Sequence, residues 1–169
     1  DAGGNGDGLA IAADNEGNGY VTGYSDILIG QLFAKSIPTT KIDPTGSVLW
    51  FRDLVVEEGA NHAGYGVAAD DDGNVYSVGG INQGENRGVV VSYAPDGGER
   101  WLDVYDIDPG DPFNDAWMRS VRIGSGGLVY VDINAQFDQP QAYDYTILVY
   151  DPASGADVDE KRVDLDSHS

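Results

Sequence analysis

The 169-residue chain contains no cysteine. This excludes disulfide bonds, thiolate nucleophiles and every zinc site that depends on cysteine. Basic residues are also scarce: 9 Lys and Arg stand against 29 Asp and Glu, which gives a formal net charge of -20 at pH 7. Because such a charge repels phosphate backbones and anionic headgroups, we expect neither nucleic acid nor a membrane surface as a partner.

Long apolar runs are missing too. No stretch approaches the roughly 18 residues that a membrane-spanning helix requires, so we expect no membrane insertion. The sequence begins at Asp1 without an initiator Met. We interpret it as a processed segment and predict an extracellular or cell-surface protein, secreted with its signal removed.

Catalytic motifs are absent as well. The two histidines, His62 and His168, show no H-E-x-x-H spacing, and no serine lies in a G-x-S-x-G elbow. The scattered carboxylates form no recognisable acid and base pair. We therefore predict that the chain is not an enzyme, and we name no catalytic residue and no organic cofactor.

Glycine is abundant, with 24 residues placed between short runs of Val, Ile and Tyr. No long segment carries clean helical periodicity, and the pattern is typical of strands joined by tight turns. The apolar content of 41% is sufficient for one hydrophobic core. These features predict an all-β protein that forms a single domain over residues 1–169.

An internal repeat runs through the chain with a period of about 55 residues, which is the size of one β-propeller blade. Three segments align, and they place one tyrosine of each copy at the same point. A second set of segments, each containing a turn, follows further along. The aligned sequences are GLAIAADNEGNGYVTG from Gly8, GYGVAADDDGNVYSVG from Gly64 and MRSVRIGSGGLVYVDI from Met118, then KIDPTGSVLW to Trp50, YAPDGGERW to Trp101 and VYDPASG over 149–155.

Each copy divides into four strand signals, which predicts three four-stranded antiparallel blades at about 8–54, 64–105 and 117–165. In the second copy the strands are expected at 65–69, 75–78, 89–93 and 100–104, with Gly73 and Asn74 in the first tight turn. A β-helix or a sandwich with the same number of strands is the alternative. It is less favoured because sandwiches seldom carry so regular a repeat.

The pattern of Ala-Ala-Asp, Gly-Asn, an aromatic strand and Asp-Pro-x-Gly before Trp resembles the bacterial propeller repeats called SBBP repeats. The segment from Asp43 to Trp50 also resembles the docking motif of quinoprotein-type (PQQ-like) propeller repeats. That resemblance implies that Trp50 and Trp101 pack between neighbouring blades. Quinoproteins commonly use adjacent cysteines and calcium in a complete ring, whereas this chain has no cysteine and only three copies. The third copy also departs from the pattern, because Gly126-Gly127 replaces Gly-Asn and no Trp follows Gly155.

Three blades are fewer than the four to eight that usually close a propeller. Open edges and faces favour association, so we predict a structural or interaction module that self-associates into a ring or fibre. The alternatives are that further blades of a longer chain complete the ring, or that a completed ring forms a ligand-binding or hydrolytic site for glycan or peptide.

Two acidic features could hold calcium. The turns at Asp14 and Asp70 have the opening of a calcium loop but lack its final Glu, so we interpret them as hairpin turns. The stiffer segment between copies two and three is the better candidate, with a solvated acidic loop as the alternative. Its proposed ligands are Asp106, Asp108, Asp111 and Asp115.

Loops that join blades, and loops inside them, are expected to share one face of a propeller. Polar and aromatic residues in these loops are candidates for binding a partner. The candidates are Asn61, His62, Arg87, Trp117, Phe137, Asp138 and Tyr143.

Overall fold

The computed structural model describes residues 5–29, 32–84, 86–106, 115–137 and 142–163. These residues form 12 strands, and no helix occurs among them. The all-β prediction is therefore confirmed. A search of the same residues finds no helical segment with the length and apolarity needed to cross a membrane.

The strands follow one another as three sets of four, which we call the first, second and third units. The first unit contains β1 (Gly6–Ala13), β2 (Gly19–Ile29), β3 (Leu32–Ile42) and β4 (Val48–Leu54). The second contains β5 (Asn61–Ala69), β6 (Val75–Asn82), β7 (Asn86–Tyr93) and β8 (Glu99–Tyr105). The third contains β9 (Asp115–Ile123), β10 (Val129–Phe137), β11 (Ala142–Tyr150) and β12 (Asp157–Val163).

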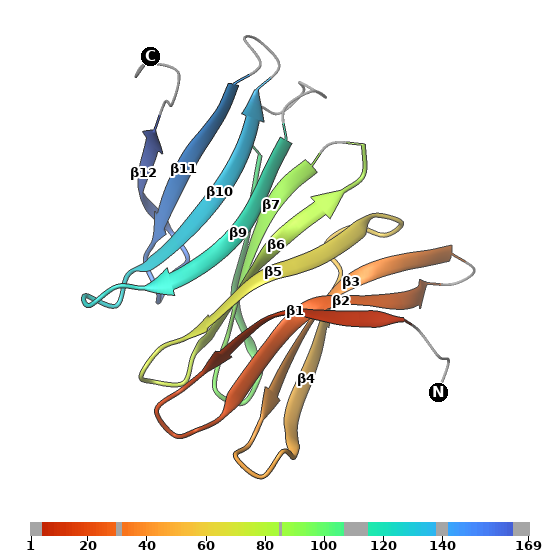
Figure 1. The fold of residues 1–169 in the computed structure, drawn as a ribbon, viewed down its shortest axis with the longest axis vertical. Helices are drawn as coiled ribbons and strands as arrows, with labels where there is room; N and C mark the ends of the chain where they lie inside the picture. The colour runs from red at the N-terminus through yellow and green to blue at the C-terminus, as the bar shows by residue number, and fades with distance from the viewer. Residues whose placement is uncertain (1–4, 30–31, 85, 107–114, 138–141, 164–169) are drawn as a thin grey trace.

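Within each unit, every strand pairs antiparallel with the next one in the sequence. Single parallel bridges, Lys35 to Asn61 and Asn86 to Asp115, link the units into one mixed, open sheet. Figure 1 shows the units side by side, with β4 and β12 at outer positions. The first strands converge, because β5 packs against both β1 and β9.

Two kinds of turn recur in the three units. The turn after the first strand has a glycine of positive φ at Gly17, Gly73 and Gly127, and the turn after the third strand has one at Gly46, Gly97 and Gly155. In this left-handed region an L side chain is strained, which explains why each copy of the sequence has glycine there.

Two hydrophobic clusters fill the spaces between units. One joins the first and second units and includes Tyr20, Trp50, Val67 and Tyr93. The other joins the second and third units and includes Tyr76, Trp101, Val121 and Tyr150. The core of this protein therefore lies between the units, so each unit depends on a neighbour to cover its apolar faces.

The four strands expected in the second copy fall inside β5 to β8, and each observed strand is longer than expected. The three aligned tyrosines also occupy one register position. Tyr20, Tyr76 and Tyr130 pair with Ala12, Ala68 and Arg122, which are equivalent residues of the three first strands. The repeat in the sequence is thus a repeat in strand pairing.

Candidate functional site

Trp50, on β4, packs between the first and second units. Its ring lies between Tyr20 and Tyr93, at centroid distances of 6.4 and 5.8 Å. Its Nε1 donates a hydrogen bond of 3.0 Å to the carbonyl oxygen of Pro95, in the turn between β7 and β8. Gly97 of that turn lies against the ring, since a Cβ there would come within 2.9 Å of Cγ.

Trp101, on β8, repeats this contact between the second and third units. Its ring lies 5.9 Å from Tyr76 and 5.9 Å from Tyr150. Its Nε1 donates a 3.0 Å hydrogen bond to the carbonyl oxygen of Pro152. The glycine against the ring is now Gly155, of the turn between β11 and β12. Trp50 and Trp101, singled out from the sequence, thus each dock on a turn of the following unit.

The acidic turns after the first strands have an internal structural role. Asp70 accepts hydrogen bonds from the backbone N–H groups of Asp72 and Asn74 and from the hydroxyl of Tyr76. Asp14 makes the equivalent contacts, including a 2.7 Å hydrogen bond from the Tyr20 hydroxyl. These carboxylates connect each turn to the tyrosine that packs on the tryptophan. Burial also raises the pKa of Tyr76 to about 12, which keeps its hydroxyl protonated.

The first unit presents the same kind of face without a neighbour among the described residues. Ile11 pairs with Val21 at the register position where Val67 pairs with Ser77 and Val121 pairs with Val131. Ile11 is 76% exposed, whereas Val67 and Val121 are 4% and 0% exposed. This exposed apolar surface is therefore the uncovered equivalent of the two internal interfaces.

The outer side of the third unit is open as well. Tyr130 is 40% exposed, although the equivalent Tyr20 and Tyr76 are fully buried. At the register position of Trp50 and Trp101, β12 carries Asp159, which pairs with Val149 as Trp101 pairs with Ser92. At this position the third unit therefore has no indole that could dock on a further unit.

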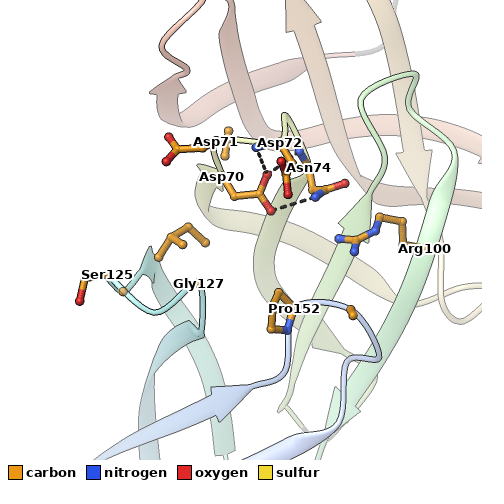
Figure 2. Close-up of a pocket in the computed structure, with 12 residues that line it drawn as sticks. Asp70, Asp71, Asp72, Asn74, Arg100, Ser125, Gly127 and Pro152 are labelled. Atoms are coloured by element: carbon orange, nitrogen blue, oxygen red, sulfur yellow. Dashed lines mark hydrogen bonds between the residues drawn. The ribbon is translucent and has the colours of Figure 1, made fainter.

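A pocket of about 620 Å³ lies where the turns of the second and third units meet. Figure 2 shows Asp70, Asp72 and Asn74 on one side and Ser125 and Gly127 on the other. Arg100 also lines it and donates a 3.0 Å hydrogen bond to the Ser92 hydroxyl. With carboxylates and one guanidinium at its wall, this pocket suits a small polar ligand.

The pocket was missed by reasoning from the sequence. One of its two turns belongs to the third copy, where Gly124-Ser125 stands in place of the acidic Asp70-Asp71. The corresponding space between the first and second units has the acidic residues on both sides and measures about 140 Å³. The altered turn was visible in the sequence and was the signal that could have pointed to this pocket.

The predicted calcium segment lies mostly outside the described residues, including Asp108 and Asp111. Asp106 follows β8, and Asp115 begins β9, where it accepts a 2.6 Å hydrogen bond from Asn86. Among the described residues, no group of three His, Cys, Asp or Glu side chains is placed to hold a metal ion. Calcium binding by this segment stays a prediction.

The predicted interaction residues lie in several environments. Asn61 is exposed at the start of β5, Arg87 forms a 2.6 Å ion pair with Glu57, and Trp117 is half-buried with its ring 5.8 Å from Tyr65. Phe137 lies in β10 and Tyr143 lies in β11, and Asp138 lies outside the described residues. The binding of a partner by this set stays a prediction.

His62 differs from the others because its side chain is 1% exposed. Its Nδ1 lies 2.8 Å from the carbonyl oxygen of Lys35, and its Nε2 accepts hydrogen bonds from the N–H groups of Val56 and Glu57. Burial lowers the pKa of His62 below its usual value, so the neutral ring with the proton on Nδ1 fits these contacts. The ring holds the loop between β4 and β5 against β3.

No family model matches this chain, and a search of curated proteins found no significant match. The resemblance to SBBP and quinoprotein-type repeats thus gains no support from these comparisons and stays a prediction.

Proposed function

We propose that this chain is a non-enzymatic structural and interaction module: an incomplete β-propeller whose three blades self-associate through their open faces into a ring or fibre. Each unit is an antiparallel four-stranded meander whose first strand packs against the first strand of the next unit. That arrangement, with an apolar core between successive units, supports the interpretation of the units as blades.

The exposure of equivalent residues carries the proposal. Ile11 is exposed where Val67 and Val121 are buried, and Tyr130 is partly exposed where Tyr20 and Tyr76 are buried. These residues occupy equivalent register positions within their own units and differ in whether another unit covers them. Since large exposed apolar surfaces commonly mark association sites, a further blade is the expected cover.

The exposed apolar residues concentrate on the first unit. Among the side chains that the structure describes, six of the ten large apolar ones that are exposed belong to it: Leu9, Ile11, Leu28, Val48, Leu49 and Phe51. The third unit contributes three, Tyr130, Ile147 and Val158. We therefore expect the first unit's face to provide most of the association energy.

Sedimentation velocity of the wild-type chain over a wide concentration range tests the proposal. We expect the average mass to rise with concentration and expect Ile11→Asp to abolish the rise, because a charge would then be buried in the interface. Leu102→Asp is the matched control, since Leu102 is also exposed but lies on β8 of the second unit, which has a neighbouring unit on each side. A wild-type chain that stays monomeric throughout, or an Ile11→Asp variant that still associates, contradicts self-association through this face.

The pocket at Asp70 and Arg100 supports a second candidate, a ligand-binding module for glycan or peptide. Its two turns come from different units, so the pocket exists only when both are docked. Titration of the protein with panels of oligosaccharides and short peptides, followed by NMR, tests this candidate. Shifts at Asp72, Arg100 and Ser125 would favour it, and their absence would leave the pocket as a solvent-filled space between turns.

A further inference from the structure

The turn between β3 and β4 is built like the two turns that receive a tryptophan. Asp43 N–H donates to the carbonyl oxygen of Ser47 and Gly46 N–H donates to that of Asp43, as in the turn at Ala94. The turn at Asp151 has the same two hydrogen bonds and is one residue longer. Gly46 has a φ of 89°, close to the 82° of Gly97 and the 70° of Gly155. The backbone that accepts an indole is thus formed three times.

At two of these three turns the indole is present. A Cβ on Gly97 or Gly155 would come within 2.9 or 2.5 Å of a tryptophan ring, whereas among the described residues nothing lies within 4 Å of the corresponding position on Gly46. The first unit therefore has the glycine, the turn and the preceding Pro44, but no ring on them. Positive φ favours glycine in all three turns. At Gly97 and Gly155 the tryptophan ring also leaves no room for a Cβ, which is a second reason for glycine there.

The sheet beside this turn has the shape of an uncovered interface. A hollow of about 210 Å³ is lined by Val21, Pro38, Thr40 and Phe51, among other residues of the first unit. In the second unit the residues at the places of Pro38 and Thr40 are Val89 and Val91, which are buried against the first unit. Continuity with the two internal interfaces therefore identifies the cover as another blade.

The third unit of a second copy is a poor cover for this face. At the three positions where the second unit presents Ala68, Val78 and Trp101 to its neighbour, the third unit has Arg122, Asp132 and Asp159. Asp159 is paired with Lys161 at 2.8 Å in solvent. Placing these charges against apolar residues costs free energy that the tryptophan contact does not. The third unit thus resembles the polar terminal repeat that closes other repeat arrays.

We infer that the open face of the first unit is an acceptor for a tryptophan-bearing β-blade of a partner other than a second copy of this chain. The partner's indole packs on Gly46 and donates its N–H to the carbonyl oxygen of Pro44, as Trp50 does at Gly97 and Pro95. This inference goes beyond the proposed function, because it names a different partner for the same face. We expect this face to bind a second copy of the chain more weakly than it binds the partner's blade.

The chain itself can supply the probe. A donor variant carries Arg122→Ala, Asp132→Val and Asp159→Trp, so that its third unit has the outward residues of the second unit. It also carries Ile11→Asp, which blocks its own acceptor face. The acceptor is the ¹⁵N-labelled wild-type chain. A reference donor carries Ile11→Asp alone, so that its third unit is unaltered. Far-UV circular dichroism and thermal unfolding establish that every variant is folded.

We expect the donor variant to form a 1:1 complex with the acceptor in sedimentation velocity, with amide shifts at Gly46 and Val21. The reference donor is expected to bind at least about tenfold more weakly. In the acceptor, Gly46→Ala places a methyl group where the indole must lie and should weaken binding by about tenfold or more. Gly59→Ala is its matched control, because Gly59 has a φ of 82° with nothing within 4 Å of a Cβ and lies outside this turn.

Three outcomes overturn the inference: a folded donor variant that does not bind, equal binding by the Gly46→Ala and Gly59→Ala acceptors, or a reference donor that binds as tightly as the donor variant. The last outcome leaves the proposed function intact and makes the second copy the natural partner. Conversely, a wild-type chain that stays monomeric while the donor variant binds removes self-association and supports the acceptor face.

Discussion

Trp101 lies directly on the backbone of Gly155, so closely that a methyl group on this glycine would come within 2.5 Å of the ring atom Cδ2. The indole N–H is bonded at the same time to the carbonyl oxygen of Pro152, three residues earlier. One turn of the third unit therefore offers both an apolar platform and a hydrogen-bond acceptor to the second unit. Trp101 and Gly155 are 54 residues apart in the sequence. They meet because the repeat places the fourth strand of one unit against a turn of the next unit.

Gly155→Ala is expected to destabilise the protein more than Gly46→Ala. Both substitutions put a side chain at positive φ, which costs about 1–2 kcal/mol. Gly155→Ala also forces the methyl group into Trp101, and such overpacking adds about 1–3 kcal/mol, whereas Gly46 has open space. Urea unfolding of the two variants measures the difference. Equal losses would show that the indole does not press on this turn.

Trp50→Phe isolates the hydrogen bond to Pro95 from the packing of the ring. The phenyl ring retains most of the aromatic contact with Tyr20 and Tyr93 but has no N–H, so we expect a loss of about 1–2 kcal/mol in the free energy of unfolding. Trp50→Ala removes both and is expected to cost about 3–5 kcal/mol. Chemical denaturation measures both values. A Phe variant as unstable as the Ala variant would mean that the hydrogen bond, and not the ring, holds the units together.

The repeat, the strands and the glycine turns were predictable because each depends on local residues. Alternation of apolar residues marks a strand, and Asp-x-x-Gly-Asn fits a turn with positive φ wherever it occurs. Tyr20, Tyr76 and Tyr130 could be aligned for the same reason. The pairing of strands within a unit then follows from short connections.

What each face meets could not be predicted in this way. Ile11 and Val67 are similar residues in similar strands, yet one is exposed and the other is buried, because burial depends on a neighbouring unit. His62 was expected on a surface loop and lies inside, since its ring satisfies backbone groups of a loop that carries no pattern of its own. Asp159 occupies the position equivalent to Trp101, but this equivalence could be recognised only from the pairing register of β12 with β11.

Acid unfolding should depend on Asp14. Burial alone raises the pKa of this carboxyl, but hydrogen bonds from Asn18, Tyr20 and the backbone lower it to about 2, against the usual 3.8. Because the folded-state pKa lies below the unfolded one, the carboxylate stabilises the fold above pH 3.8 and this contribution is lost as the pH falls towards 2. Asp14→Asn is expected to flatten that part of the stability profile, measured by tryptophan fluorescence in urea at several pH values. An unchanged slope contradicts the assignment.

Calcium provides a test of the segment that contains Asp108 and Asp111. If these residues bind the ion with Asp106 and Asp115, millimolar calcium raises the melting temperature, since a ligand that binds only the folded chain stabilises it. The double variant Asp108→Ala, Asp111→Ala should lose the shift, and magnesium at the same concentration controls for screening of the acidic surface. No shift in the wild-type chain, or an equal shift in the double variant, excludes this calcium site.

A second pH dependence should come from His62, at higher pH. Burial lowers its pKa below 6.5 in the folded chain, although the hydrogen bond to the Lys35 carbonyl opposes this effect. The unfolded chain then binds the proton more readily than the folded chain does, so stability is complete above pH 6.5 and falls as the pH drops towards the folded-state pKa. His62→Gln should be less stable at neutral pH, because a buried N–H group of Val56 or Glu57 loses its acceptor, but its stability should vary less between neutral and mildly acidic pH. The variant retains His168, so urea unfolding of the two proteins across this range assigns the difference to His62. Parallel stability profiles would show that the pKa of His62 is the same in the folded and unfolded chains, which contradicts the effect of burial.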